Sequence, residues 1–391
     1  MNSFNSSKNT VFLLGGFFLF FGYSICAQIL PGAQDTSAYL PLLKGKKIGV
    51  VAHAASQIYH GDKATHLIDS LLSHKINLTK IFAPEHGFRS REDNGAIIKD
   101  EIDASTQLPI ISLHGKNRKP QVAHLKNIDL MVFDLQDVGV RFYTYLSTLH
   151  LVMEACAENS IPLIILDRPN PNGHYVDGPL MEEEYKGFLG MHSIPIVHGL
   201  TLGEFAQMIN GEQWLKDGKH CAITVIKNKN YTHSSAYDLP VRPSPNLPNS
   251  KAINLYPSLC LFEQTPISIG RGTEKQFQVY GHPDLTGVFS FTPQPNFGAK
   301  YPKLAGKICH GENLQHTPKL NQLSLKWLIS AYRGYPEKTN FFLKRFVILA
   351  GTKKLEQQIQ AGWSEEEIRK SWSSDLYHFN SIREKYLLYP N

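Results

Sequence analysis

The first part of the chain alternates short runs of apolar residues with segments of helical periodicity. The apolar runs are nearly continuous, which is typical of strands buried on both faces of a parallel sheet. Each run ends in glycine, proline or polar residues, as strands do where a loop begins. Strands with their loops are expected at residues 46–54, 78–87, 108–115, 128–139 and 161–173.

Two segments between these runs carry apolar residues at helical spacing. KATHLIDSLLSHK, residues 63–75, would align Ala64, Leu67, Ile68, Leu71 and Leu72. YTYLSTLHLVMEACAEN, residues 143–159, would align Leu146, Leu149, Met153, Cys156 and Ala157. Strands that alternate with helices predict an α/β fold, here a Rossmann-like domain with a mostly parallel sheet.

The pattern changes from about residue 240, where VRPSPNLPNS is rich in proline, serine and asparagine and indicates a linker or a shaped loop. A glycine- and aromatic-rich section follows, and then helical segments that end in REKYLLYPN. We therefore predict a first domain over residues 28–245 and a smaller C-terminal α+β domain over residues 246–391.

The first residues have the pattern of an export signal. Lys8 precedes VFLLGGFFLFFGYSICAQ, so residues 1–27 are predicted to be a signal peptide cleaved after Ala27. The protein would then be periplasmic or extracellular. Lipidation at Cys26, which would attach the protein to a membrane, ranks second because Ile25 stands where a small residue is expected. An uncleaved anchor ranks lower because the apolar run is short.

Composition narrows the classes of ligand. Hydrophobic residues make up 42% of the chain and charged residues 19%, and the net charge of +6 is too small and diffuse to indicate nucleic acid. Neither GxGxxG after the first strand nor GxxxxGK[ST] occurs, which argues against a nucleotide site. Without HExxH, CxxC or GxSxG, the sequence indicates no metal, no cofactor and no serine nucleophile elbow.

Three predicted strands end in polar motifs, which are EHG at 85–87, DLQD at 134–137 and DRPNPNG at 167–173. Carboxyl ends of parallel strands share one edge of a sheet, so these motifs should lie on one rim. Burial beside an apolar strand favours the protonated form of a carboxyl group, which would suit Glu85 to general acid catalysis. Alternatively, Glu85 caps the next segment and His86 binds a backbone carbonyl.

The DLQD motif offers two carboxylates. Alternation along the strand sends Asp134 and Gln136 to one face, with Asp137 at the turn. The two carboxylates could hold a sugar hydroxyl, activate water or bind a metal. The simpler interpretation is a turn at a helix start, paired with Arg141.

Two further motifs present cations. In DRPNPNG, two prolines fix the backbone and present Arg168 and Asn170 rigidly, unless the stretch is a plain turn. GRGTE offers Arg271 and Glu274 as an anion clamp or as a solvated pair, and Glu263 follows another apolar run. The residues alone thus predict an exported α/β protein with a rim of carboxylate, arginine and asparagine side chains and a hydrolytic function.

Seven stretches resemble the exo-β-N-acetylmuramidase family, the NamZ-type glycoside hydrolases first catalogued as a domain of unknown function. They are FAPEHGF, FDLQDVGVRFYTY, LDRPNPNG, HGLTLGEFA, PSPNLP, SIGRGTEKQF and the terminal YLLY, in this order from about residue 46 to the end. The resemblance implies a Rossmann-like domain, a smaller C-terminal domain and an active site between them. It also implies release of N-acetylmuramic acid from the non-reducing end of peptidoglycan fragments, without metal or nucleotide.

The resemblance also implies residue roles. Glu85 corresponds to the catalytic carboxylate, and His86, beside it in the same motif, is also expected to be a catalytic residue. The sugar's lactyl carboxylate requires a fixed cation with fork geometry, for which Arg141, Arg168 and Arg271 are the candidates. Further substrate contacts are expected from Gln136, Tyr143, Asn170, Glu263 and Glu274.

Cleavage of a glycoside needs an acid for the leaving oxygen and a nucleophile or a base for water. Glu85 is the expected acid, and the second group stays open among Asp134, Asp137, Glu263 and Glu274, or is the substrate's own acetamido group. The expected partners are oligosaccharides of N-acetylmuramic acid and N-acetylglucosamine. The rival interpretations are a non-catalytic glycan-binding protein and a peptidoglycan amidase or deacetylase.

Two stretches depart from the family pattern. His53-Ala54-Ala55-Ser56 stands where many members have Asn-Xaa-Thr, so a substrate contact made there by other members need not be made here. Gln264-Thr265-Pro266 stands where many have Gly-Thr-Asn, which affects the local loop shape. Neither change involves Glu85.

Overall fold

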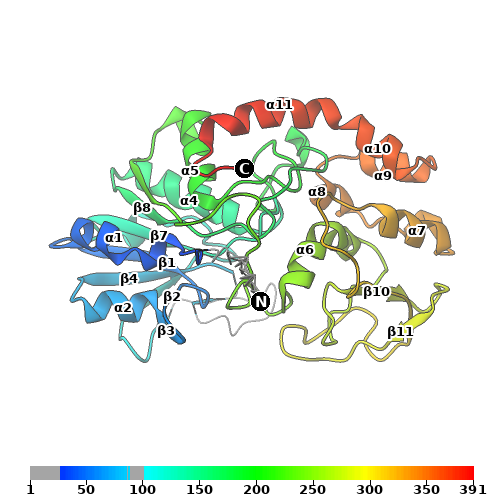
Figure 1. Ribbon diagram of the computed structural model, residues 1–391, viewed down its shortest axis with the longest axis horizontal. Helices are drawn as coiled ribbons and strands as arrows, with labels where there is room; N and C mark the ends of the chain where they lie inside the picture. The colour runs from blue at the N-terminus through cyan, green and yellow to red at the C-terminus, as the bar shows by residue number, and fades with distance from the viewer. Residues whose placement is uncertain (1–26, 86, 89–100) are drawn as a thin grey trace, which may run out of the picture.

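The computed structural model describes residues 27–85, 87–88 and 101–391, and its centre is a seven-stranded sheet (Figure 1). Its strands are β1 (Ile48–Ala52), β4 (Leu78–Ala83), β5 (Glu101–Ile102), β6 (Pro109–Ser112), β7 (Leu130–Asp134), β8 (Leu163–Leu166) and β9 (Ile223–Ile226). The order is β5-β6-β4-β1-β7-β8-β9, and every neighbouring pair is parallel except β5 with β6. The predicted α/β fold with a mostly parallel sheet is confirmed.

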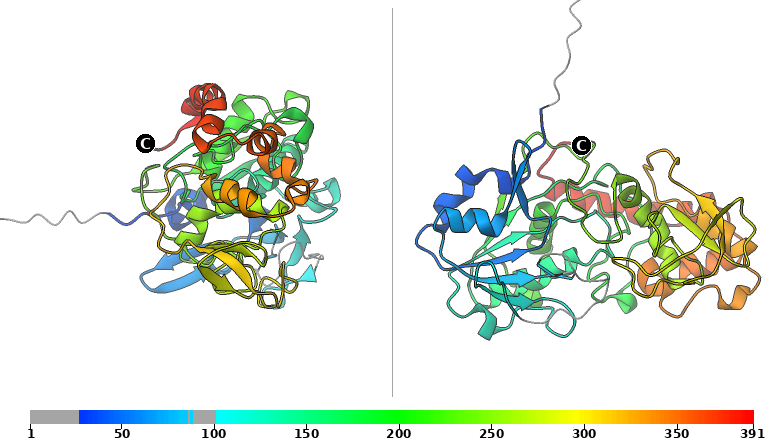
Figure 2. Two further views of the ribbon diagram at one scale, coloured as in Figure 1. Left: turned by 90° about the vertical axis from the view of Figure 1, so that its right-hand side faces the viewer. Right: turned by 90° about the horizontal axis from the view of Figure 1, so that it is seen from below.

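Helices cover both faces of this sheet, which explains the continuous apolar strands. Val50 and Val132 belong to one apolar cluster, whereas their neighbours Val51 and Phe133 belong to another, because successive residues of a strand point to opposite faces. Two helices pack on the first cluster and lie together on one face (Figure 2, right), α1 (Thr36–Leu43) and α2 (Leu67–Ser73). The second cluster is covered by α3 (Val122–Leu125), α4 (Tyr145–Glu158) and α5 (Leu202–Gly211).

The predicted helix over residues 63–75 is wrong in its first part. Residues Lys63–His66 form strand β3, which pairs antiparallel with β2 (Gln57–His60). The helix begins only at Leu67, where the His66 ring accepts a hydrogen bond from the Ile68 N–H and caps the helix. The second predicted helix is confirmed as α4.

The C-terminal part lies beside the first part, with α11 reaching back toward α5 (Figure 1). It has a three-stranded antiparallel sheet, ordered β10-β12-β11, of β10 (Val279–His282), β11 (Phe289–Phe291) and β12 (Cys309–Asn313). Its helices are α6 (Ser250–Leu259), α7 (Lys326–Gly334), α8 (Phe346–Ala350), α9 (Lys354–Gln360), α10 (Glu365–Ser371) and α11 (Ser373–Arg383). The boundary at residues 245 and 246 stays a prediction.

The end of the chain returns to the first part. The Tyr389 hydroxyl donates to Asp167 Oδ2 at 2.6 Å and accepts from the Asn228 N–H at 2.9 Å, and Asp167 directly follows β8. The terminal YLLY motif is therefore an anchor between the two parts. Among the described helices, none is both long and apolar enough to cross a membrane. The predicted signal peptide and Cys26 lie outside the described residues, apart from Ala27.

Candidate active site

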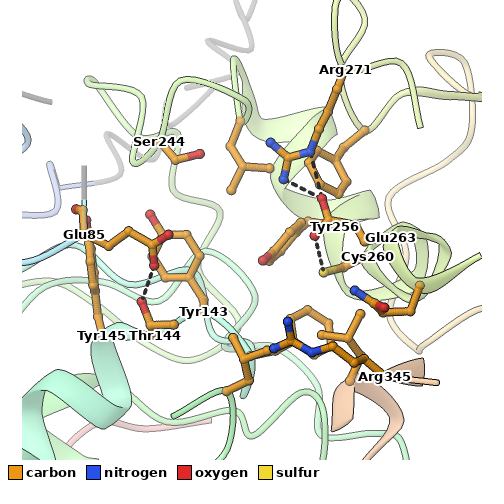
Figure 3. A pocket seen from close by; sticks show the side chains of 16 residues that line it. Glu85, Tyr143, Thr144, Tyr145, Ser244, Tyr256, Cys260, Glu263, Arg271 and Arg345 are labelled. Atoms are coloured by element: carbon orange, nitrogen blue, oxygen red, sulfur yellow. Dashed lines mark hydrogen bonds and ion pairs between the residues drawn. The ribbon is translucent and has the colours of Figure 1, made fainter. Parts of the chain in front are cut away.

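A cavity of about 320 Å³ lies between the two parts of the molecule (Figure 3). Glu85 reaches it from the loop after β4, and residues 142–145 reach it from the segment that leads into α4. The C-terminal part contributes Glu263, Arg271 and Arg345. The remaining lining residues are Leu189, Ser244, Leu247, Tyr256, Cys260, Gln264, Phe277 and Leu349.

Glu85 is presented to the cavity by the end of β4. The strand stops at Ala83, and Pro84 has no N–H with which to continue the ladder, so the chain turns there. Glu85 is partly buried, and its Oε2 accepts a hydrogen bond from the Thr144 hydroxyl at 3.0 Å. The carboxyl group is thereby held against the first turn of the segment that opens α4.

A second contact fixes the backbone of Glu85 through a buried histidine. The Gln136 N–H donates to His53 Nε2 at 3.0 Å, which leaves the proton of the neutral ring on Nδ1. His53 Nδ1 then donates to the Tyr145 hydroxyl at 3.2 Å, and Tyr145 donates to the Glu85 carbonyl oxygen at 3.4 Å. His53 thus has a positioning role, from the loop where the sequence departs from the family pattern.

The opposite side of the cavity carries an ion pair (Figure 3). Glu263 Oε1 lies 2.7 Å from Arg271 Nε and 2.5 Å from Arg271 Nη2. Burial lowers the pKa of Arg271, but the Glu263 carboxylate more than offsets this effect, so the pKa of Arg271 is raised. The guanidinium also lies 5.0 Å from the centre of the Phe277 ring. The charges of Glu263 and Arg271 are therefore paired with each other.

Arg345 is the other cation on this side. It precedes α8, and its side chain lines the cavity across from Glu85 (Figure 3). No hydrogen bond or ion pair holds its guanidinium within the described part of the chain. Arg345 is therefore available to an anion that enters the cavity.

The other titratable side chains among the described lining residues are neutral. Burial raises the pKa of the Tyr143, Tyr145 and Tyr256 hydroxyls well above their usual value. It likewise raises the pKa of the Cys260 thiol, so this cysteine is not a thiolate nucleophile. Tyr143, a predicted substrate contact, lines the cavity, and its hydroxyl donates to the Pro243 carbonyl oxygen at 2.7 Å.

Asp134 and Arg168 form a buried pair and are not among the described residues that line this cavity. Arg168 donates from Nε to Asp134 Oδ1 at 2.5 Å and from Nη2 to Oδ2 at 2.9 Å. The exposed fractions are 0% for Asp134 and 5% for Arg168. The two charges are therefore paired with each other, and the predicted roles of both residues stay predictions.

Gln136 and Asn170 hold loops together. Gln136 Nε2 donates to the carbonyl oxygens of Asp137 and Pro169, both at 2.8 Å. Asn170 Nδ2 donates to the Leu200 carbonyl at 2.9 Å, and its Oδ1 accepts from a backbone N–H at 2.8 Å. These amides satisfy backbone groups at the rim and do not line the cavity.

Arg141, a predicted carboxylate ligand, lies in the interior and binds four backbone carbonyls. Its Nη1 donates to the oxygens of Pro179 and Ile194 at 2.9 and 2.7 Å. Its Nη2 donates to Leu349 and Ala350 at 3.0 and 2.8 Å. Only 1% of Arg141 is exposed, so this guanidinium fastens α8 to the first part and does not reach a ligand.

The remaining predicted site residues lie apart from the cavity. Asp137 is buried and accepts a hydrogen bond from the Gly139 N–H at 2.6 Å. Glu274 is exposed and does not line the cavity. His86 lies outside the described residues. Within the part of the chain that the structure describes, no group of three or more His, Cys, Asp or Glu side chains is placed to hold a metal.

Two family models match the chain. They are the N-terminal part of exo-β-N-acetylmuramidase NamZ, over residues 48–251, and its C-terminal part, over residues 254–389. The chain belongs to the exo-β-N-acetylmuramidase NamZ family. The protein is therefore a glycoside hydrolase. Family membership is compatible with a second protein carboxylate and with the substrate's acetamido group as the second catalytic group.

Relatives agree with this membership over nearly the whole chain. The peptidoglycan β-N-acetylmuramidase NamZ of Bacillus subtilis (strain 168) is 35% identical, over 98% of this chain and 100% of the relative. A crystal structure of a DUF1343 family protein from Bacteroides fragilis is 46% identical, with a TM-score of 0.86 over 93% of this chain and 100% of that one. A second such protein from the same organism is 29% identical, with a TM-score of 0.79 over 92% and 99%.

The structure brings together four of the predicted site residues of this NamZ family member, which are Glu85, Tyr143, Glu263 and Arg271. Sequence reasoning missed the hydroxyl of Thr144, the His53–Tyr145 contact and Arg345. Thr144 and Tyr145 stand inside the FYTY motif, which was a usable signal. Nothing in LKRFV around Arg345 distinguishes it from a surface cation.

Proposed function

We propose that this protein hydrolyses the glycosidic bond of N-acetylmuramic acid at the non-reducing end of peptidoglycan fragments. The observation that carries this proposal is the cavity itself, in which Glu85 faces two arginines from the C-terminal part. A carboxyl group can protonate a leaving oxygen, and an arginine matches the lactyl carboxylate that distinguishes this sugar. The name of the Bacillus subtilis relative, peptidoglycan β-N-acetylmuramidase, supports the same substrate class.

Glu85 acts as the general acid in this proposal. Its proton passes to the glycosidic oxygen as the bond from that oxygen to the anomeric carbon breaks. The oxygen of a water molecule forms the new bond to the anomeric carbon, and a proton of this water restores the carboxyl group. Thr144 and Tyr145 donate to the side chain and to the backbone carbonyl of Glu85, and so fix its position at the cavity.

The geometry leaves fewer candidates for the second catalytic group. Of the four carboxylates left open by the sequence, Glu263 alone lines the described cavity wall, whereas Asp134, Asp137 and Glu274 do not. Glu263 is already paired with Arg271. The substrate's acetamido group therefore remains the alternative to Glu263 as the nucleophile.

An exo mode of action suits the size of the cavity. Small-molecule pockets hold about 300–1,000 Å³. The cavity of about 320 Å³ is at the lower end of this range and fits a terminal sugar better than a continuous glycan. The expected substrates are oligosaccharides of N-acetylmuramic acid and N-acetylglucosamine.

Export is part of the proposal, since peptidoglycan lies outside the cytoplasm. The apolar start of the chain, residues 1–27, supports a periplasmic or extracellular location, with a membrane-bound form only if Cys26 is lipidated. The small excess of positive charge favours approach to an anionic wall polymer.

The test is to incubate the protein with defined oligosaccharides that carry N-acetylmuramic acid at the non-reducing end and to identify the released products by mass spectrometry. Each peptide-free chain should yield one free N-acetylmuramic acid and a shortened product that ends in N-acetylglucosamine. Chains whose lactyl groups carry stem peptides should be cleaved far more slowly, because the carboxylate is then an amide. Absence of any release by folded protein would favour the rival glycan-binding function, and loss of acetyl or peptide groups instead would identify a deacetylase or an amidase.

A further inference from the structure

The four arginines that could bind a substrate carboxylate differ in how exposed they are and in whether they already have partners. Arg141 and Arg168 are 1% and 5% exposed, and they donate to backbone carbonyl oxygens and to Asp134, respectively. Arg271 reaches the cavity, but its Nε donates a hydrogen bond to Glu263 Oε1 and its Nη2 forms an ion pair with the same oxygen. Recruitment of Arg271 would require breaking this pair and leaving Glu263 beside an incoming anion. Arg345 faces the same cavity without such a cost.

The charge of the cavity agrees with a substrate that carries one carboxylate. Among the described lining residues, Glu85 and Glu263 bear negative charge when ionised, and Arg271 and Arg345 bear positive charge. A general acid must hold its proton before it donates it, so Glu85 is neutral in the reactive complex. The remaining sum is −1 + 2 = +1, which one carboxylate neutralises.

Arg345 is held in place from both ends of a short segment. On its N-terminal side, the Leu343 N–H donates to the Gln264 carbonyl at 3.0 Å, which ties the segment to the wall that carries Glu263. On its C-terminal side, Arg141 binds the last carbonyls of α8, those of Leu349 and Ala350. Leu349 also lines the cavity.

The contact between Arg141 and the end of α8 is close. Gly351 follows the helix with φ of 83°, and a Cβ atom there would lie 2.5 Å from Arg141 Nη2. The Glu182 N–H also donates to the Gly351 carbonyl at 2.7 Å. The first part of the molecule therefore sets the position of a segment whose other end presents Arg345 to the site.

We infer that Arg345 is the residue that selects a substrate carboxylate, and that Arg141 is a positioning residue that acts through α8. This inference rests on the proposed function, since it names the group that would recognise the lactyl carboxylate. The guanidinium offers two parallel N–H donors, the geometry that a carboxylate binds best.

The experiment compares nitrophenyl β-N-acetylmuramide with nitrophenyl β-N-acetylglucosaminide, which lacks the lactyl group. Hydrogen bonds to charged groups contribute about 1.5–3 kcal/mol, so Arg345→Met should reduce the ratio of the two kcat/KM values roughly 10- to 150-fold. The loss should arise mainly from KM for the muramide, and Arg345→Lys should recover part of it. The control is Lys344→Met, which removes an exposed neighbouring cation that does not line the cavity and should keep the ratio of the wild type.

The outcomes separate this inference from the proposed function. A folded Arg345→Met variant that keeps the wild-type ratio overturns the inference and leaves the proposed function intact. A wild type that prefers neither glycoside contradicts the proposed function. In that case, calorimetric binding of N-acetylmuramic acid and N-acetylglucosamine to wild type and Arg345→Met decides the role of Arg345, because equal preferences in both proteins overturn it.

Discussion

At the scale of single residues, Asp137 shows how burial changes a carboxyl group. Its Oδ2 accepts from the Gly139 N–H at 2.6 Å, and burial raises its pKa from 3.8 to about 7. His198 Nε2 lies 3.8 Å from the same oxygen, a separation that would suit an ion pair. However, burial lowers the pKa of His198 to about 3, so both groups are neutral in the folded protein through much of the acidic range.

This neutral form predicts a pH-dependent stability. Between about pH 4 and 7 the folded protein keeps the Asp137 proton that the unfolded chain releases, so this contribution to stability is present at low pH and lost as the pH rises. Asp137→Asn has no proton to release and should lack this loss. Urea unfolding at several pH values should show wild type losing stability relative to the variant from pH 4.5 to 7.5, and parallel profiles would contradict the assignment.

Only some of the residues that line the cavity could be predicted from the sequence. Glu85 was predictable because an apolar strand ends at a proline directly before it. Arg141 and Arg168 were equally conspicuous, but a motif does not reveal whether an arginine meets solvent, a ligand or carbonyl oxygens. The structure shows that both are buried and donate hydrogen bonds to groups inside the protein. Arg345 carries no local signal, because its environment is created by residues distant in the chain.

At the scale of elements, the buried strands were predictable from continuous apolar runs, and α4 was predictable from apolar residues at helical spacing. The segment 63–75 did not, because Lys63–His66 pairs with Gln57–His60 and the pairing overrides the helical spacing of Ala64. Local periodicity cannot show such a partner. The position of α8 likewise depends on Arg141, which lies far from it in the sequence.

The role of α8 can be tested with a matched pair of glycines. Gly351 and Gly362 both have φ of 83°, but a Cβ at Gly362 meets no atom within 4 Å, whereas at Gly351 it meets Arg141. Each alanine substitution should cost about 1–2 kcal/mol for the left-handed backbone. Gly351→Ala should lose more stability in urea unfolding and should also lower the preference for the muramide. Equal effects of the two substitutions on stability and preference would contradict the positioning role of α8.

At the scale of the whole molecule, the site exists only because two parts of the chain meet. The sequence predicted the α/β class and a polar rim at the strand ends, yet most of that rim holds loops together. The opposite wall comes from Glu263, Arg271 and Arg345, whose approach to Glu85 depends on packing between the two parts. The hydrogen bond from the Tyr389 hydroxyl to Asp167 also joins the C-terminal part to the first part.

The central claim is that Glu85 donates a proton to the leaving oxygen. The most direct measurement compares wild type and Glu85→Gln on a muramoyl disaccharide, whose leaving group needs protonation, and on dinitrophenyl β-N-acetylmuramide, whose leaving group does not. Loss of a general acid should reduce disaccharide cleavage about 100-fold or more while largely sparing the first turnover of the dinitrophenyl glycoside, since only the later attack of water needs residue 85 to accept a proton. Equal loss on both substrates, or no loss on either, would contradict the role of Glu85 as the acid.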